Sequence, residues 1–139
     1  MTTPPLADVP IRSAEQLTDR WTAVLDPPIF GARSLWLMWL HDDGRPLPVI
    51  IPVDDLPRLP DHGQLFGLLS VHEGISESHL GGGGHLALAL CRPGRPDITE
   101  DDDAWVDALS EVFDDRIEGS WSLHLAAGGR VQPLIDLPS

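Results

Sequence analysis

The sequence predicts a single α/β (α+β) domain in which helices flank one mixed β-sheet. The stretch His85–Cys91 is apolar on both faces, as in a strand that lies inside a sheet. An amphipathic helical pattern follows Thr99, and an alternating strand follows that helix. Because such elements are interspersed over 139 residues without a repeat or a linker, one sheet with helices packed against it is expected.

The first element is expected to be a helix after a loose N-terminus. Residues 1–12 are proline-rich and are predicted to be flexible, so the folded domain is expected to span residues 13–139. Ser13 has the position of a helix N-cap, and Gln16 is placed to complete a capping box. Apolar residues then recur at helical spacing, which predicts a helix over Ala14–Leu25 that ends before a pair of prolines.

Two strands are expected next. Residues Ser34–His41 are apolar on both faces, which is typical of a strand covered on both sides. The turn sequence Asp42-Asp43-Gly44-Arg45 leads into a return strand, Leu47–Val53. Since Pro48 and Pro52 have no N–H group, this strand is expected at an edge of the sheet or with a bulge.

A short helix and a mobile loop are predicted in the middle of the chain. Leucines on one side of Gln64–His72 indicate the helix. The segment Glu73–Gly84 ends in four consecutive glycines and is expected to be the most mobile loop.

The strand His85–Cys91 then presents leucines on one face and small residues on the other. The small face lets a helix approach closely, so this strand is expected to be central.

Thr99 has the position of the N-cap of the helix with the clearest pattern. Glu100–Asp103 place four carboxylates in its first turn, where negative charge suits the helix dipole. The cluster Asp101–Asp103 has a functional interpretation, as a cation site or a contact for a basic partner. The structural interpretation is that these carboxylates form a solvent-exposed first turn stabilised by the helix dipole, which requires neither a cation nor a partner.

The C-terminal residues predict a hairpin. Trp121–Ala126 alternates apolar and polar residues, and His124 on the polar face is expected to be solvated or hydrogen-bonded. Two glycines turn the chain into Arg130–Ile135, and Pro133 again indicates an edge. Four of the five tryptophans lie on apolar faces and are expected in the core. Trp36 would mark an interface if its side of the strand is uncovered.

Composition excludes several classes of function. The net charge is −13, and such a surface repels phosphate backbones and anionic lipids, so neither nucleic acid nor a membrane is expected as a partner. All nine basic residues are arginines, and the absence of lysine removes Schiff-base and P-loop chemistry. The N-terminal segment lacks the pattern of a signal peptide and no apolar run is long enough to span a bilayer, so a cytoplasmic protein is expected.

Few side chains are candidates for chemistry. His72, His79 and His85 flank the glycine-rich segment, with two glutamates between them, and together with Asp103 they could build an atypical metal site. Their spacing matches no established metal-binding motif, so chance proximity is the simpler explanation. Cys91 is the only cysteine, which excludes an intrachain disulfide. At the end of an apolar strand it is expected to be buried and inert.

The stretch Leu86–Leu134 combines an apolar strand, a proline-glycine loop, an acidic helix start, an amphipathic helix and a hairpin with a glycine turn. This arrangement resembles the JAB/MPN metalloprotease fold, a cytidine-deaminase-like architecture, and within it the bacterial RadC-like branch. The hairpin Leu123–Leu134 (LHLAAGGRVQPL) resembles the closing strands of the family. The resemblance covers the C-terminal third of the chain and, loosely, the hairpin Trp36–Val53.

The metal-binding residues of that family are absent. In the family the strand ends in His-x-His-Pro, two histidines and an aspartate hold zinc, and an upstream glutamate is the base. Alignment on Pro93 places Leu90 and Arg92 at the two histidine positions, Glu100 at a serine position and Asp103 at the ligand aspartate. One carboxylate cannot hold zinc at useful affinity. The resemblance therefore implies a metal-free, catalytically inactive relative without a cofactor.

The leading prediction is a non-catalytic protein-interaction or scaffold domain, a pseudoenzyme whose acidic surface selects a protein partner. In the fold it resembles, Glu73–Gly84 lies near the former cleft and is a candidate contact region. The alternative is a hydrolase with a metal site built from His72, His79 or His85 and Asp103. A homodimer formed through an exposed strand edge or a tryptophan patch is the third possibility.

Overall fold

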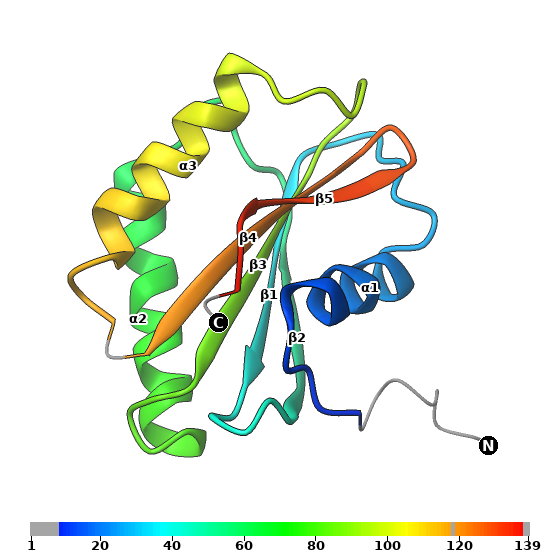
Figure 1. Ribbon diagram of the computed structural model, residues 1–139. Coiled ribbons are helices and arrows are strands. Elements are labelled where there is room, and N and C mark those ends of the chain that lie inside the picture. The colour runs from blue at the N-terminus through cyan, green and yellow to red at the C-terminus, as the bar shows by residue number, and fades with distance from the viewer. Residues whose placement is uncertain (1–8, 118, 138–139) are drawn as a thin grey trace.

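The computed structural model describes residues 9–117 and 119–137, and these form three helices and a five-stranded sheet (Figure 1). In chain order the elements are α1 (Ala14–Val24), β1 (Ser34–Leu40), β2 (Pro46–Val53), α2 (His62–His79), β3 (His85–Cys91), α3 (Glu100–Phe113), β4 (Ser120–Ala127) and β5 (Arg130–Ile135). The predicted class, a mixed sheet flanked by helices, is confirmed.

The strands lie in the order β2-β1-β3-β4-β5. β1 pairs antiparallel with β2 and with β3, and β4 pairs antiparallel with β5. β3 and β4 are parallel and are connected through α3. β3 is therefore central, as predicted, and the strands that contain Pro48, Pro52 and Pro133 are the two edges, also as predicted.

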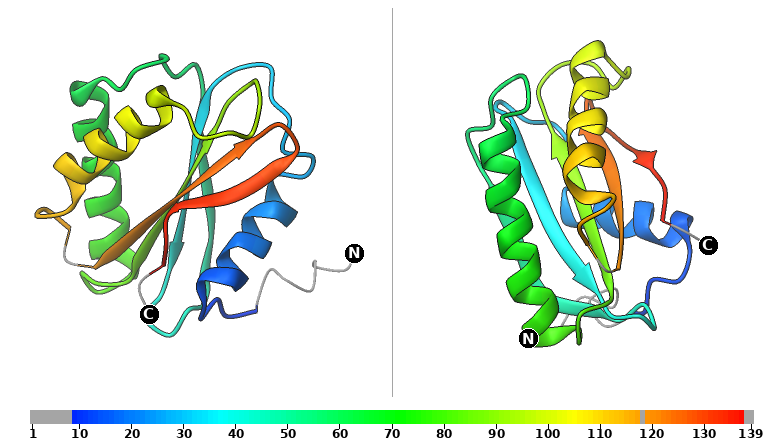
Figure 2. Two further views of the ribbon diagram at one scale, coloured as in Figure 1. Left: turned by 45° about the horizontal axis from the view of Figure 1, so that its top comes forward. Right: turned by 90° about the vertical axis from the view of Figure 1, so that its left-hand side faces the viewer.

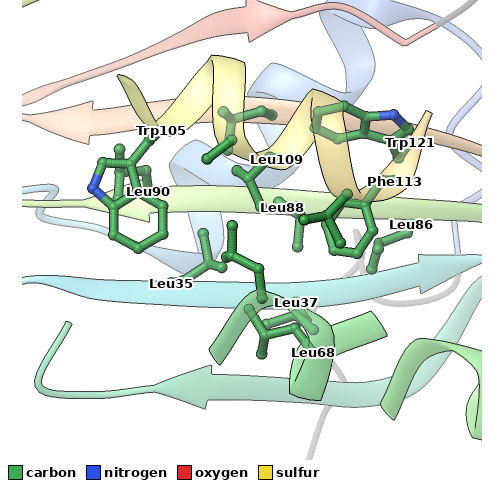
Figure 3. Packing of buried hydrophobic residues seen from close by; sticks show 14 of the residues in the cluster. Leu35, Leu37, Leu68, Leu86, Leu88, Leu90, Trp105, Leu109, Phe113 and Trp121 are labelled. Carbon is green, nitrogen blue, oxygen red and sulfur yellow. The ribbon is translucent and has the colours of Figure 1, made fainter. Parts of the chain in front are cut away.

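Helices cover both faces of the sheet. α2 and α3 pack on one side and α1 packs on the other, as Figures 1 and 2 show. The α2–α3 side buries the larger cluster, in which the leucines of β3 meet Trp105, Leu109 and Phe113 of α3 (Figure 3). On the other side, Leu17 and Trp21 of α1 lie against the small residues of β3. The alternation of large and small side chains on β3 thus decides which helices pack on which face.

The start of the described chain is fixed to the β1–β2 turn. Residues 1–8 of the segment predicted to be flexible lie outside the described residues. Ile11, within the same predicted segment, is buried, and its N–H donates to the carbonyl of Gly44 at 2.8 Å. Ser13 caps α1 by accepting from the N–H of Gln16, but the side chain of Gln16 accepts from Arg12 instead of closing the predicted capping box.

α2 is twice as long as predicted, because it begins at His62 and continues past His72 to His79, over 18 residues. Most of the segment Glu73–Gly84, expected to be a mobile loop, is therefore helical, and that prediction is wrong. The buried positions of α2 continue at helical spacing beyond His72 to Ser76. A run rich in glycine and serine conceals this spacing in the sequence, because such residues have low helix propensity.

Candidate functional site

The C-terminal end of β3 is the place where the resemblance puts the zinc ligands. Leu90 is fully buried in the core and offers no lone pair to a metal. Arg92 follows directly after β3 and carries a positive charge. Glu100 and Asp103 lie exposed in the first turn of α3. The residues at the two histidine positions therefore do not fit a zinc ion.

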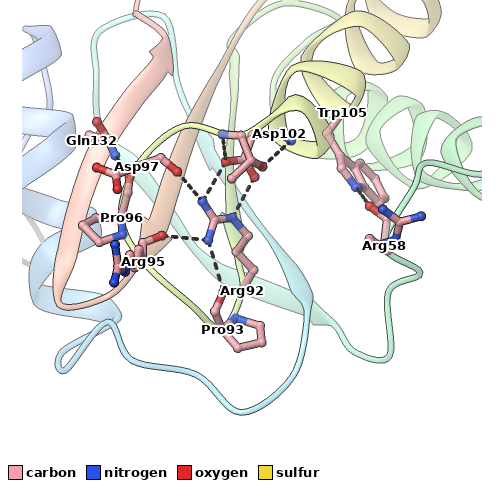
Figure 4. A network of polar contacts seen from close by, with 10 residues as sticks. Arg58, Arg92, Pro93, Arg95, Pro96, Asp97, Asp102, Trp105 and Gln132 are labelled. Carbon is pink, nitrogen blue, oxygen red and sulfur yellow. Dashed lines mark hydrogen bonds and ion pairs between the residues drawn. The ribbon is translucent and has the colours of Figure 1, made fainter.

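Arg92 holds the end of β3 together through a saturated set of hydrogen bonds (Figure 4). Its Nε and Nη2 donate to the two carboxylate oxygens of Asp102, each at 2.8 Å. The other N–H groups donate to the carbonyls of Pro93, Arg95 and Asp97 at 2.8–3.1 Å. All five guanidinium N–H groups are thus used, and none remains for a ligand.

Asp102 corrects the expectation that the acidic cluster is a solvent-exposed first turn. Its exposed fraction is 0%, although Asp103 beside it is exposed. Besides binding Arg92, Asp102 forms a capping box with Thr99, with bonds of 2.9 and 3.2 Å. Burial alone would raise the pKa of Asp102, but hydrogen bonds from Arg92 and Thr99 outweigh it and lower that pKa. The pair ties the loop after β3 to the start of α3.

The four candidate metal ligands lie on different parts of the molecule. His72 is buried in α2 and accepts a hydrogen bond from Trp39 Nε1 at 3.1 Å. His79 is exposed in the last turn of α2, and Asp103 is exposed at the start of α3. His85 is buried at the start of β3. Within residues 9–117 and 119–137, no group of three or more His, Cys, Asp or Glu side chains could hold a metal ion.

A buried polar cluster lies on the α1 side of β3 and β4. His85 binds Ser120 Oγ through Nδ1 and Ser122 Oγ through Nε2, both at 2.7 Å. Farther along β4, His124 Nε2 binds Thr18 Oγ1 of α1 at 2.8 Å. His124 was expected to be either solvated or hydrogen-bonded. It is hydrogen-bonded and not solvated, because its exposed fraction is 0%. The sequence shows the polar face of β4, and only the packing shows that α1 covers it.

Ser120 and His85 have the spacing of a nucleophile and its base, and both line a cavity of about 400 Å³. Burial, reinforced by His124 and His72, lowers the pKa of His85 to about 4, which makes it a weak base at neutral pH. The N–H of Ser120 donates to the carbonyl of Gly84, and the N–H of Gly84 donates to Asp42. Neither N–H is free to stabilise an oxyanion, so the pair has the features of a structural cluster.

Cys91 is buried in the central strand with an exposed fraction of 0%, as expected. Burial raises the pKa of its thiol to about 12. The thiol is therefore protonated at physiological pH and has little nucleophilic character.

The solvent side of α2 carries apolar side chains and glycines, and we call Phe66, Gly67, Ser70, Val71 and Gly74 the α2 outer face. All five residues are exposed, with 43% of Phe66 and 42% of Val71 accessible to solvent. Helical spacing places Gly67, Ser70 and Gly74 between the two apolar side chains. This surface was missed from the sequence because the helix was expected to end at His72.

A second, acidic surface lies beside the α2 outer face. α2 and α3 lie side by side (Figure 2). His62 Nε2 lies 3.3 Å from Glu111 Oε2, and the Arg116 guanidinium lies 5.1 Å from the Phe66 ring centre. The exposed residues of α3, spaced three or four apart, are all acidic; we call them the α3 acidic face, namely Glu100, Asp103, Asp107 and Glu111. The α2 outer face, whose five residues carry no charge, therefore borders a strongly negative surface.

Comparison of the chain with protein-family models, with curated proteins and with solved structures finds no match. The relationship to the JAB/MPN fold consequently stays a prediction. None of the helices formed by residues 9–117 and 119–137 has the length and apolar character needed to cross a membrane.

Proposed function

We propose that this chain is a non-catalytic protein-interaction domain with a JAB/MPN-like fold and without a metal site. The α2 outer face is the observation that carries the proposal. Phe66 and Val71 are exposed on a regular helix that already buries its opposite side in the core. Exposed apolar side chains that gather on one element are typical of protein contact surfaces.

The state of the reactive side chains supports the non-catalytic part of the proposal. The hydrogen-bonding capacity of Arg92 is filled by the loop and by Asp102. Cys91 is buried as a protonated thiol. His85 and His124 are bonded inside the cluster between α1 and the sheet. Residues that hold the fold in this way are poorly placed to turn over a substrate.

A cytoplasmic location is part of the same proposal. Cys91 is free, and a chain with one buried thiol and no disulfide suits a reducing compartment. The acidic composition, with a net charge of −13, supports a protein partner over nucleic acid or a lipid surface.

Metal analysis tests the non-catalytic half. The protein is purified without a tag or chelator, incubated with zinc and desalted, and its zinc content is measured. We expect far less than one zinc per chain. Stoichiometric zinc accompanied by peptide hydrolysis would overturn the proposal and restore the metal hydrolase.

Affinity capture tests the interaction half. Wild-type protein and a Phe66→Ser variant are used as bait in the source cells, with Thr22→Ala on the exposed side of α1 as the matched control. We expect one or more proteins to be retained by the wild type and the control but lost from Phe66→Ser. Equal retention by all three baits would remove the α2 outer face as the contact surface.

A further inference from the structure

Two glycines of α2, Gly67 and Gly74, are not required by packing among the described residues. Glycine inside a helix destabilises it relative to alanine, yet α2 contains Gly63, Gly67 and Gly74 within its 18 residues. We consider a Cβ atom added at Gly67 or Gly74 and leave aside the adjacent residues and the nearby backbone of α2 itself. Among the other described residues, no heavy atom would lie within 4 Å of that Cβ. Alanine would fit both positions and would stabilise the free protein. Functional sites are where natural proteins depart from local rules of this kind.

The shape of the α2 outer face suits another helix. Phe66 lies on the side toward α3, where Arg116 stacks on its ring, and helical spacing places Val71 on the opposite side. Gly67, Ser70 and Gly74 lie between these two side chains and expose little more than the helix backbone to solvent. Because the distance between packed helices depends on the side chains at their contact, this low strip permits a close approach by a second helix.

The surrounding charge restricts the chemistry of that helix. The α3 acidic face lies along one side, and Glu73 and Glu77 are exposed on α2 itself. Arg116 places a positive charge at this boundary, and its Nη1 donates to the carbonyls of Glu111 and Val112. A second copy of this chain would bring another net charge of −13 against the same surface. A basic helix would meet the acidic face with complementary charge.

We infer that the α2 outer face binds an amphipathic helix of a partner protein, with small and apolar residues toward α2 and arginine or lysine toward the α3 acidic face. The inference rests on the proposed interaction function and names the chemical class of its partner.

Two synthetic helical peptides, each matched to the 18 residues of α2 in length, test the charge preference. Both carry the same stripe of alanine and leucine; arginines flank the stripe in one peptide and glutamates in the other. Fluorescence anisotropy measures their binding to the full chain. We expect the basic peptide to bind at least about tenfold more tightly than the acidic one, and its binding to weaken as salt is added.

Gly67→Ala and Gly74→Ala test the contact surface, because they should shift stability and binding in opposite directions. Each should raise the melting temperature of the free protein by a few degrees, through better helix propensity. Each should weaken binding of the basic peptide about tenfold, since the added methyl group forces the two helices apart. Thr22→Ala on α1 provides the control, with improved helix propensity and unchanged binding.

Three outcomes would overturn the inference: equal binding of the two peptides, binding of neither, or glycine variants that are more stable but bind as well as wild type. A dimer seen by light scattering and lost in Gly67→Ala would make a second copy the occupant. If Phe66→Ser loses a captured partner while neither peptide binds, the interaction function stands and the basic helix is rejected.

Discussion

Arg92 and Asp102 show how this small core contains opposite charges. Both side chains are nearly inaccessible to solvent, with exposed fractions of 4% and 0%, and they meet through two hydrogen bonds of 2.8 Å. Removing two charges from water is costly, and the cost is offset only when the remaining hydrogen-bonding groups are also satisfied. The loop carbonyls and the helix cap meet that condition here.

Loss of one partner from this pair should be strongly destabilising. Arg92→Met leaves Asp102 buried with an unpaired charge and removes the bonds that hold the loop of residues 93–97, so we expect a loss of about 3–5 kcal/mol in the free energy of unfolding. Urea denaturation measures it. Arg45→Gln is the matched control, because Arg45 pairs with Asp43 at the surface. This variant should have the same free energy of unfolding as the wild type. Similar losses of unfolding free energy in the two variants would contradict the prediction that the buried ion pair matters more than the exposed one.

The buried histidines make stability depend on pH. Burial lowers the pKa of His85 and of His124 from 6.5 to about 4. Between these values the unfolded chain binds more protons than the folded one. The contribution of the two neutral histidines to the free energy of unfolding is therefore complete above pH 6.5 and is lost as the pH falls toward 4. Each histidine contributes roughly 3 kcal/mol at most.

Urea denaturation between pH 7 and 5 should therefore show stability falling as the solution is acidified, before most carboxylates titrate. His124→Gln keeps a partner for Thr18 but no longer titrates, so its pH dependence should be shallower than that of the wild type. A free energy of unfolding that is flat over this range would show that both histidines titrate normally.

At the scale of elements, local pattern predicted the strands and the third helix. His85–Cys91 could be placed at the centre of the sheet because its two faces differ in side-chain size, and α3 could be placed because Thr99 and the apolar stripe define it. The extent of α2 could not be predicted, since its second half is held by packing of Ile75 and Ser76 while its glycines and serines favour a loop.

The polar groups of the candidate site were less predictable than the strands. The alternation in β4 predicts that Ser122 and His124 share a face, but whether water or a helix covers that face depends on where α1 packs. The same holds for Arg92, whose partner Asp102 lies ten residues away and becomes visible only when the loop closes. Sequence periodicity gives the direction of a side chain and leaves its partner undetermined.

The edge strand β2 has protection against pairing with another chain. Pro52 is opposite Trp36 of β1, and Pro48, four residues earlier, lies where the register between β1 and β2 shifts. Alternate residues of an edge strand direct their N–H groups away from the sheet, and proline removes that donor. We expect Pro48→Thr combined with Pro52→Thr to promote self-association, measured by light scattering. Pro57→Thr, in the exposed loop after β2, is the control; association in that variant too would mean that the strand edge is not responsible.

At the scale of the whole molecule, the excess of 22 acidic over 9 basic residues opposes the compact state. Sodium chloride screens this repulsion, so raising it from about 10 mM to about 0.5 M should raise the melting temperature. Asp107→Arg on the α3 acidic face should lower the sensitivity to salt. A melting temperature that falls with added chloride would show that surface ion pairs outweigh the repulsion.

The position of Cys91 makes the protein its own reporter of opening. The thiol lies in β3 between β1 and β4, opposite Ser34 and Ala126, and is inaccessible in the folded sheet. A thiol-labelling reagent can react only when α1 separates from this face of the sheet or the sheet itself opens, so the labelling rate reports these opening events. With one cysteine in the chain, each labelled molecule records one such event at one known residue.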